Sequence, residues 1–339
     1  MLKDNQINPK LRKRFCKDFN VPINIFTDPE FTRKLETYFQ YDDDTKFAWQ
    51  RFKEMLTTFY EEYGEAAFTD KFLEYSNSLQ EKMIEELKFK LADFNQKELP
   101  ALPEIASKYP HHDIFKAPNA EKMYISIDMM SANFHSLREY DPNIFTNGDK
   151  TLSTSYKEWV HSFTTFSDYF AQSKGFRQCI FGNCNPKRQQ SYEMYLMSLL
   201  VKDYLIPKDL DKYIVALHND EIIISVPEDQ YPYAFHEQVE KAIASSPIAY
   251  FLRIDMFKLQ YIAPIKAFIK HHLFMDTSAS PKKVYEFKCL PANIFHEVLC
   301  YKFRIPITKD DLAFISQDGR MAHYDEPIPN PFAQITSKI

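Results

Sequence analysis

Two short segments of the chain carry carboxylates beside apolar runs. In one, residues 213–227, Asp220 and Glu221 stand between two stretches of strand-forming residues that end at Pro227. Side chains alternate between the faces of a strand, so only one of these carboxylates faces a given site. An unpaired carboxylate in apolar surroundings is costly, and a divalent cation compensates it. The segment predicts a metal-binding hairpin; the alternative is a tight turn in which Asn219 and Asp220 supply only turn geometry.

The second segment, residues 122–134, runs from apolar residues into Asp128 and then into small and polar residues. We expect Asp128 near the end of a buried strand. Two strands that each carry an acidic residue, with a mainly helical insertion between them, are typical of the metal site of a nucleotidyl-transferring palm domain. Asp128 and Asp220 would bind a pair of Mg²⁺ or Mn²⁺ ions that activate a 3′ hydroxyl and stabilise the leaving pyrophosphate, with Glu221 as an auxiliary carboxylate.

The chain here resembles family A DNA polymerases and their single-subunit RNA polymerase relatives. Residues 218–221, His-Asn-Asp-Glu, with the Val-Pro that follows, are similar to the family's His-Asp-Glu strand, although Asn219 is inserted. Asp128 takes the place of the family's first catalytic aspartate, and His218 would position the primer end. The resemblance covers roughly residues 122 to 263. It implies template-directed transfer from nucleoside triphosphates to a DNA or RNA primer by a small, reduced enzyme.

A basic segment between the two acidic strands extends the resemblance. Residues 177–182, Arg-Gln-Cys-Ile-Phe-Gly, look like the Lys-x-x-x-Phe-Gly core of the family's fingers helix. On a helix, Lys174, Arg177 and Phe181 share one face, which suits an incoming triphosphate with its base stacked on the ring. The alternative is an amphipathic surface helix with a buried Phe181.

Helices flank this basic segment. Residues 155–172 have aromatic residues at helical spacing, and Asn185 followed by Pro186 predicts the N-cap and first turn of a helix that runs to about residue 204. Lys187 and Arg188 in that first turn oppose the helix dipole unless an anion is near, so we expect them to contact phosphate.

The choice of sugar is left open by the residues after Asp128. Asn133 lies five positions later, where polymerases of this general type place a bulky residue that screens the 2′ hydroxyl. Asparagine is smaller than tyrosine or phenylalanine, so discrimination against ribonucleotides would be weak. The adjacent Phe134 could serve instead.

These elements predict an α+β fold built from four parts. A helical N-terminal domain (1–99), with apolar stripes at helical spacing, leads through a Pro-rich linker (100–120) into a palm with a mostly antiparallel sheet (121–263). A short fingers-like helical insertion occupies about 150–208 of the palm. Residues 264–339 form a C-terminal accessory region.

Composition limits the classes of function. The chain has 339 residues, 45% of them hydrophobic, and can bury a large core. With 5 glycines and no GxxxxGK[ST] or GxGxxG motif, P-loop and Rossmann sites are excluded. No apolar run approaches the ~20 residues that span a bilayer, and no signal peptide is evident, so we expect a cytoplasmic protein without membrane contact. The aromatic-rich, Lys-rich, Gly-poor composition would suit a phage or mobile element.

The net charge of −5 weighs against a tight grip on a long duplex. A protein partner could compensate for this acidic balance. Two other functions remain open on the same residues. One is a template-independent palm nucleotidyltransferase or a nucleotide cyclase; the other is a non-catalytic palm-like factor that binds nucleic acid or protein.

Overall fold

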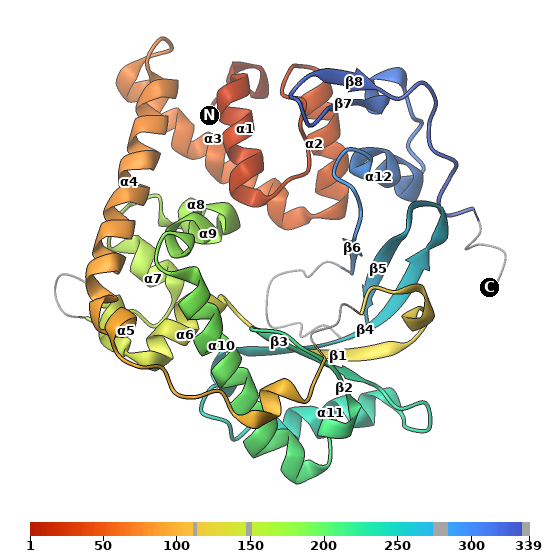
Figure 1. The fold of residues 1–339 in the computed structure, drawn as a ribbon. Helices are drawn as coiled ribbons and strands as arrows, with labels where there is room; N and C mark the ends of the chain where they lie inside the picture. Colours follow the sequence, from red (N-terminus) through yellow and green to blue (C-terminus); the bar gives the residue numbers. More distant parts are fainter. Residues whose placement is uncertain (111–113, 147–150, 274–283, 334–339) are drawn as a thin grey trace.

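A computed structural model describes residues 1–110, 114–146, 151–273 and 284–333. Helices fill the first hundred residues, and a six-stranded sheet follows, ordered β2-β3-β1-β4-β5-β6 (Figure 1). Every strand pair in this sheet is antiparallel. The expected α+β class with a mostly antiparallel sheet is confirmed. Residues 111–113 of the expected linker lie outside the described residues.

The N-terminal helices form because apolar residues recur at spacings of three and four. Phe52 and Phe59 on one helix contact Phe72 on the next, with ring centroids 5.6 and 5.7 Å apart. These stripes are therefore core. The helices are α1 (Pro9–Phe19), α2 (Glu30–Tyr41), α3 (Asp43–Tyr63), α4 (Phe68–Lys90) and α5 (Ala92–Gln96).

The sheet lies below these helices in Figure 1. Its strands are β1 (Met123–Met129), β2 (Ile214–Leu217), β3 (Glu221–Ser225), β4 (Leu252–Ile262), β5 (Ala267–His272) and β6 (Tyr285–Lys288). β1 and the β2–β3 hairpin occur where the sequence predicts them. The sheet does not end at residue 263, because β5 and β6 pair onto β4 and extend it.

The two faces of the sheet differ. Ile125 and Ile127 of β1 belong to the main core, together with side chains of α6 (Ala132–Tyr140), α10 (Pro186–Leu200) and α11 (Pro232–Ile243). The alternate residue Tyr124 belongs to a separate small cluster on the opposite face, with Phe257 and Phe268. Since side chains alternate, Ser126 and Asp128 share that second face. The helices thus cover one face, and the polar residues of β1 lie on the other.

The expected helix over residues 155–172 is two shorter helices, α7 (Tyr156–His161) and α8 (Ser167–Gln172). Between them the hydroxyl of Thr164 accepts a hydrogen bond from the main-chain N–H of Phe166 at 3.0 Å. Such local side-chain bonds compete with helical hydrogen bonds, and two adjacent threonines also disfavour a helix. α9 (Lys174–Gly182) follows, and then α10, which continues as a π-helical turn over Val201–Leu205.

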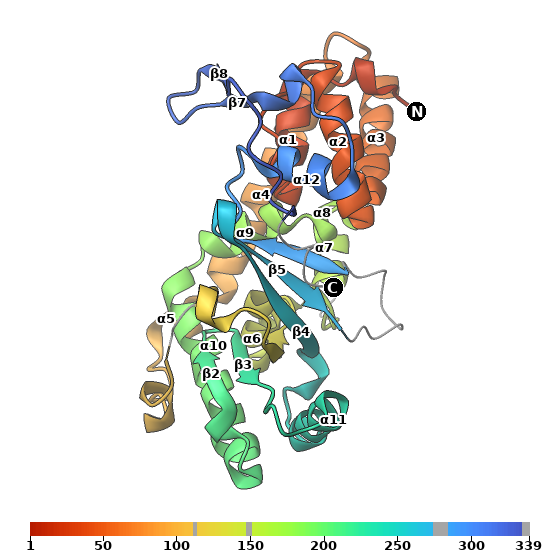
Figure 2. The same ribbon diagram turned by 90° about the vertical axis from the view of Figure 1, so that its right-hand side faces the viewer.

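The C-terminal segment returns to the N-terminal helices. α12 (Phe295–Phe303) packs beside α2, and the small hairpin β7 (Ala313–Ile315) and β8 (Met321–His323) lies next to it, as Figure 2 also shows. One hydrophobic core runs from α1 to α12. Within the described residues, every helix is too short or too polar to cross a membrane.

Gly175 lets α9 approach α1, and this contact yields a test of the packing. A Cβ at Gly175 would lie 2.3 Å from the carbonyl oxygen of Lys17, whereas a Cβ at Gly182 in the same helix meets nothing within 4 Å. We expect Gly175→Ala to lower the free energy of unfolding by about 1–3 kcal/mol, because backbone must shift. Gly182→Ala is the matched control and should leave it unchanged or raise it by up to about 1 kcal/mol. Urea denaturation of both variants measures the difference; equal effects would contradict this packing.

Candidate active site

Asp128 lies in a row of charged side chains across three strands. It is paired in register with Glu221 of β3 on one side and with Arg253 of β4 on the other. The Arg253 guanidinium lies 2.9 Å from the Asp128 carboxylate and 2.6 Å from that of Asp255. Arg253 therefore supplies the nearest positive charge to Asp128 and shares it with a second acid.

Glu221 is compensated by the protein's own groups. The hydroxyl of Ser126 donates to its Oε1 at 2.5 Å, and Nζ of the buried Lys270 lies 3.7 Å from the same oxygen. Lys270 in turn lies over the ring of Phe257. Glu221 thus shares a face with Asp128 but already has a hydrogen bond and a cation.

Asp220 lies at the same end of the strand pair, in the turn between β2 and β3. Its carbonyl oxygen accepts from the N–H of Met129 at 2.9 Å, and the N–H of His218 closes the turn on Glu221 at 2.8 Å. Asn219 and Asp220 are the central residues of this turn, so the turn geometry considered as an alternative is also present. It leaves the Asp220 carboxylate beside Asp128, and the two repel each other.

Burial and mutual repulsion perturb both aspartates. Burial raises the pKa of Asp128 to about 6 against the opposing charge of Arg253, and the negative Glu221 and Asp220 add to the rise. Burial also raises the pKa of Asp220; Glu221 adds to this, whereas a main-chain hydrogen bond, His218 and Lys174 oppose it. Carboxyl groups arranged in this way gain most from a nearby cation.

A third carboxyl group, Glu193 on α10, belongs to this site and was not predicted from the sequence. It is 3% exposed, and its Oε1 accepts a hydrogen bond from the side chain of Asn133 at 3.1 Å. Burial raises its pKa to about 7, and the charge of Asp220 adds to the rise. A signal did exist: Glu193 shares the buried stripe of α10 with Gln189, Leu196 and Met197, an unusual place for an acid.

We call Asp128, Asp220 and Glu193 the carboxyl cluster. The three groups come from β1, the β2–β3 turn and α10. Asp128 lies on the open face of the sheet and Glu193 on a helix that covers the other face, with the turn that carries Asp220 at the end of the strands. Asp220 interacts electrostatically with each of the other two. Carboxylate oxygens are the ligands that Mg²⁺ and Mn²⁺ prefer, and the raised pKa values record a deficit of positive charge. The donors fit a divalent cation in kind, but among the described residues only the ligand atoms of His296, Cys300 and Asp311 lie within 4.8 Å of one another, so a cation shared by all three carboxylates requires their side chains to move.

The predicted basic face of α9 is only partly available. Lys174 is exposed and close enough to Asp220 to lower its pKa. Arg177 is half-buried beside the ring of Tyr156, at 5.7 Å, and burial lowers its pKa. Phe181 is 1% exposed and packs on Trp159, with ring centroids 6.2 Å apart. Its ring has no free face for a base, which matches the alternative of a buried Phe181.

The start of α10 also differs from expectation. The helix begins at Pro186, but Asn185 adopts a left-handed conformation and its side chain donates to Asn95 instead of capping the helix. Arg188 donates to the carbonyl oxygen of Phe94 at 2.6 Å and to that of Lys97, so it holds α5 in place. Lys187 is exposed. Of this pair, only Lys187 is free to meet phosphate.

Of the remaining predicted residues, two lie near the carboxyl cluster and one is buried in the core. Asn133 is half-buried and reaches Glu193, so it borders the carboxyl cluster. Phe134 is fully buried against Phe145, with ring centroids 4.3 Å apart, and cannot screen a sugar. His218 is half-buried in the turn and opposes the raised pKa of Asp220.

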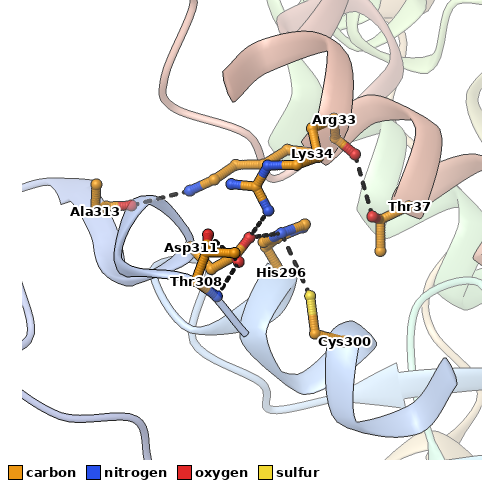
Figure 3. A network of polar contacts seen from close by, with 8 residues as sticks. All are labelled: Arg33, Lys34, Thr37, His296, Cys300, Thr308, Asp311 and Ala313. Carbon is orange, nitrogen blue, oxygen red and sulfur yellow. Dashed lines mark hydrogen bonds and ion pairs between the residues drawn. The ribbon is translucent and has the colours of Figure 1, made fainter. Parts of the chain in front are cut away.

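A second group of potential metal ligands lies far along the chain, between α2 and α12. Ligand atoms of His296, Cys300 and Asp311 lie within 4.8 Å of one another, and all three residues are buried (Figure 3). Nε2 of His296 is 2.6 Å from Asp311 Oδ1 and 3.5 Å from the Cys300 sulfur. Because both partners meet the same ring nitrogen, this is not the arrangement of a nucleophilic triad.

Asp311 already has a full set of donors. Arg33 and His296 contact Oδ1, and the N–H and hydroxyl of Thr308 donate to Oδ2 at 2.6 and 2.7 Å. Burial alone would raise the pKa of Asp311, but these hydrogen bonds hold it well below its usual range. Burial raises the pKa of the Cys300 thiol to about 12. Arg33 and the buried Lys34 place two positive charges beside this group, so binding of a metal cation there is unfavourable. The network instead joins α2 to the C-terminal segment.

Comparison with known proteins does not place this chain in a family. A scan against protein-family models, a search of curated proteins and a search of solved structures found no match for this chain. The resemblance to family A polymerases stays a prediction based on residues 122–263.

Glu193 gives a pH-dependent test of the carboxyl cluster. Its pKa is 4.5 when unperturbed and about 7 in the folded protein. The folded state therefore binds the extra proton between these values, and the free energy of unfolding falls as pH rises through this window. Glutamine cannot ionise and still accepts from Asn133. Without divalent ions, we expect Glu193→Gln to raise the free energy of unfolding by about 2 kcal/mol near pH 8, and to change it little near pH 4.

Chemical denaturation at both pH values measures this effect. Glu81→Gln, on the exposed side of α4, is the control and should change stability at neither pH. A Glu193→Gln variant that loses stability near pH 8, or gains equally at both pH values, would contradict the electrostatic account.

Proposed function

We propose that this protein is a template-directed nucleotidyltransferase, a reduced palm enzyme of the kind that family A polymerases represent. The carboxyl cluster carries the proposal. It brings together acids from β1, the β2–β3 turn and α10: Asp128 and Asp220 are half-buried and Glu193 is buried. Burial raises the pKa of each, and Asp220 adds its negative charge to the rise at Asp128 and Glu193. Structural carboxylates are normally supplied with donors, so raised pKa values of this kind favour a functional role.

Asp128 and Asp220 would hold Mg²⁺ or Mn²⁺, and Glu193 borders them. When bound, such ions activate a 3′ hydroxyl and stabilise the charge of a leaving pyrophosphate. Glu221 stays with Ser126 and Lys270 and fixes the end of β3. Arg253 holds the Asp128 side chain in place from β4.

Positive charge for a triphosphate is available beside the carboxyl cluster. Lys174 is the first residue of α9, follows the N-cap Ser173 and interacts with Asp220. Lys187 stands in the first turn of α10, and neither first turn contains an acidic residue. Each lysine adds to the positive end of its helix dipole, an arrangement that favours a bound anion.

The sugar would meet Asn133. Of the two residues considered for this contact, Asn133 borders the cluster, whereas Phe134 is buried. The short amide leaves room for a 2′ hydroxyl and can bond to it. We therefore expect both ribonucleotides and deoxyribonucleotides to be accepted.

The test is incorporation of labelled NTPs and dNTPs, with Mg²⁺ or Mn²⁺, on primed, unprimed and absent templates. Asp128→Asn and Asp220→Asn should each reduce incorporation on the order of 10²-fold or more, because each removes charge that stabilises the reaction centre. Glu221→Gln should have the smaller effect, since Glu221 is already compensated. Asp229→Asn, an exposed acid in the loop after β3, is the matched control.

Each outcome separates the candidate functions. Incorporation that follows the template and is lost in both aspartate variants supports the polymerase proposal. Products formed without a template would indicate a terminal transferase or cyclase. Activity that survives both substitutions, or no activity from folded protein, would favour a non-catalytic binding factor.

A further inference from the structure

A groove lies along one face of α10, beside the carboxyl cluster. Its volume is about 570 Å³, within the range of small-ligand sites. One wall is the segment from Leu102 to the 3₁₀ turn η2 (Glu104–Ser107), and the other is formed by Lys187, Gln190 and Met194 of α10. These α10 residues are three and four positions apart and therefore share a helix face. Asn219, in the turn between β2 and β3, closes one end.

The lining combines apolar and polar groups. Leu102, Pro103 and Met194 supply apolar surface, and Leu102 is half exposed, at 50%. Glu104 adds a carboxylate on the linker side. Lys187, Gln190 and Asn219 supply one ammonium and two amide groups. Among the described residues, the side chains of these three have no hydrogen bond or ion pair, so they are available to a ligand. Each amide can both donate and accept.

The position of the groove ties it to the carboxyl cluster. Asn219, which lines the groove, is the chain neighbour of Asp220 in the turn between β2 and β3. Neighbouring Cα atoms are about 3.8 Å apart. A ligand in the groove could therefore extend its charged end past Asn219 to Asp220.

We propose that this groove binds the base of a nucleotide, with its sugar and phosphates directed past Lys187 and Asn219 towards Asn133 and the carboxyl cluster. A base has two apolar faces and a polar edge, which match the apolar and amide groups that line the groove. The side-chain amides of Gln190 and Asn219 can each donate and accept hydrogen bonds, so they can pair with the polar edge of any base. The groove should therefore accept both purines and pyrimidines. This inference rests on the proposed function, since it places the substrate of that same site.

The groove offers a binding surface in place of predicted contacts that the fold uses elsewhere. Phe181 and Phe134 lie in the core, and Arg188 holds α5. Of the predicted cations, Lys187 is the one that lines the groove. The base would then lie on the linker side of α10, and not on the ring of Phe181.

The experiment is calorimetric titration of the full chain with ATP, GTP, CTP and UTP in Ca²⁺, which offsets the negative charge of the triphosphate and of the carboxyl cluster, with tripolyphosphate as the ligand that lacks a base. Ser191→Trp fills the groove from an exposed position on α10, and Ser78→Trp, exposed on α4, is its control. Lys187→Ala is matched with Lys202→Ala, exposed at the end of the same helix. Circular dichroism confirms that each variant is folded.

We expect Ser191→Trp to weaken binding of all four nucleotides at least about tenfold, or 1.4 kcal/mol, and to leave tripolyphosphate unaffected. Lys187→Ala should weaken nucleotides and tripolyphosphate alike, while both controls bind as wild type does. Equal affinity of wild type and Ser191→Trp for nucleotides would overturn the assignment of the groove, even if incorporation persists. Because binding is measured separately from incorporation, nucleotides that bind in the groove of a protein that incorporates none would support the groove and overturn the proposed function alone. Wild-type protein that binds no nucleotide would overturn the assignment of the groove.

Discussion

The antiparallel pairing of β1 with β3 is the constraint on which the site depends. It sets Asp128 opposite Glu221 and brings the turn that contains Asp220 to the end of β1, where Met129 donates to the Asp220 carbonyl. A slip of one residue would turn Asp128 into the helix-covered face and Ile127 out of it. The apolar residues Ile125, Ile127 and Met129, packed on that face, therefore also fix where the carboxylates lie.

The acidic side chains of this protein occupy two kinds of environment, which differ in the hydrogen-bond donors and charges that surround the carboxylate. Asp311 has hydrogen-bond donors on both oxygens and a pKa far below the usual range. Glu193 has one amide donor, a negative neighbour and a raised pKa. Asp311 is stabilised as an anion within the fold, whereas Glu193 and Asp220 would be stabilised as anions by an added cation. Leaving them short of charge costs stability, which is expected at a site that serves function.

Local pattern was enough to predict the strand that carries Asp128, the hairpin that carries Asp220, and the start of α10 at Pro186, because alternation, turn residues and proline act over a few residues. The sequence could not show which aromatic rings face the core: Phe181 and Phe134 are buried by contacts with Trp159 and Phe145, which come from other elements of the fold. Arg188 is likewise taken up by carbonyl groups of α5. Glu193 was missed because its partners, Asn133 and Asp220, come from elements far away in sequence.

The proposed chemistry requires the carboxyl cluster to bind a divalent cation, and a crystal structure with Mn²⁺ tests this most directly. Anomalous scattering locates manganese without reference to any activity. We predict manganese bound by the carboxylates of Asp128 and Asp220, with Glu193 beside it, and none between His296, Cys300 and Asp311. Manganese found only at exposed surface acids, with Arg253 still the sole cation at Asp128, would contradict the central claim.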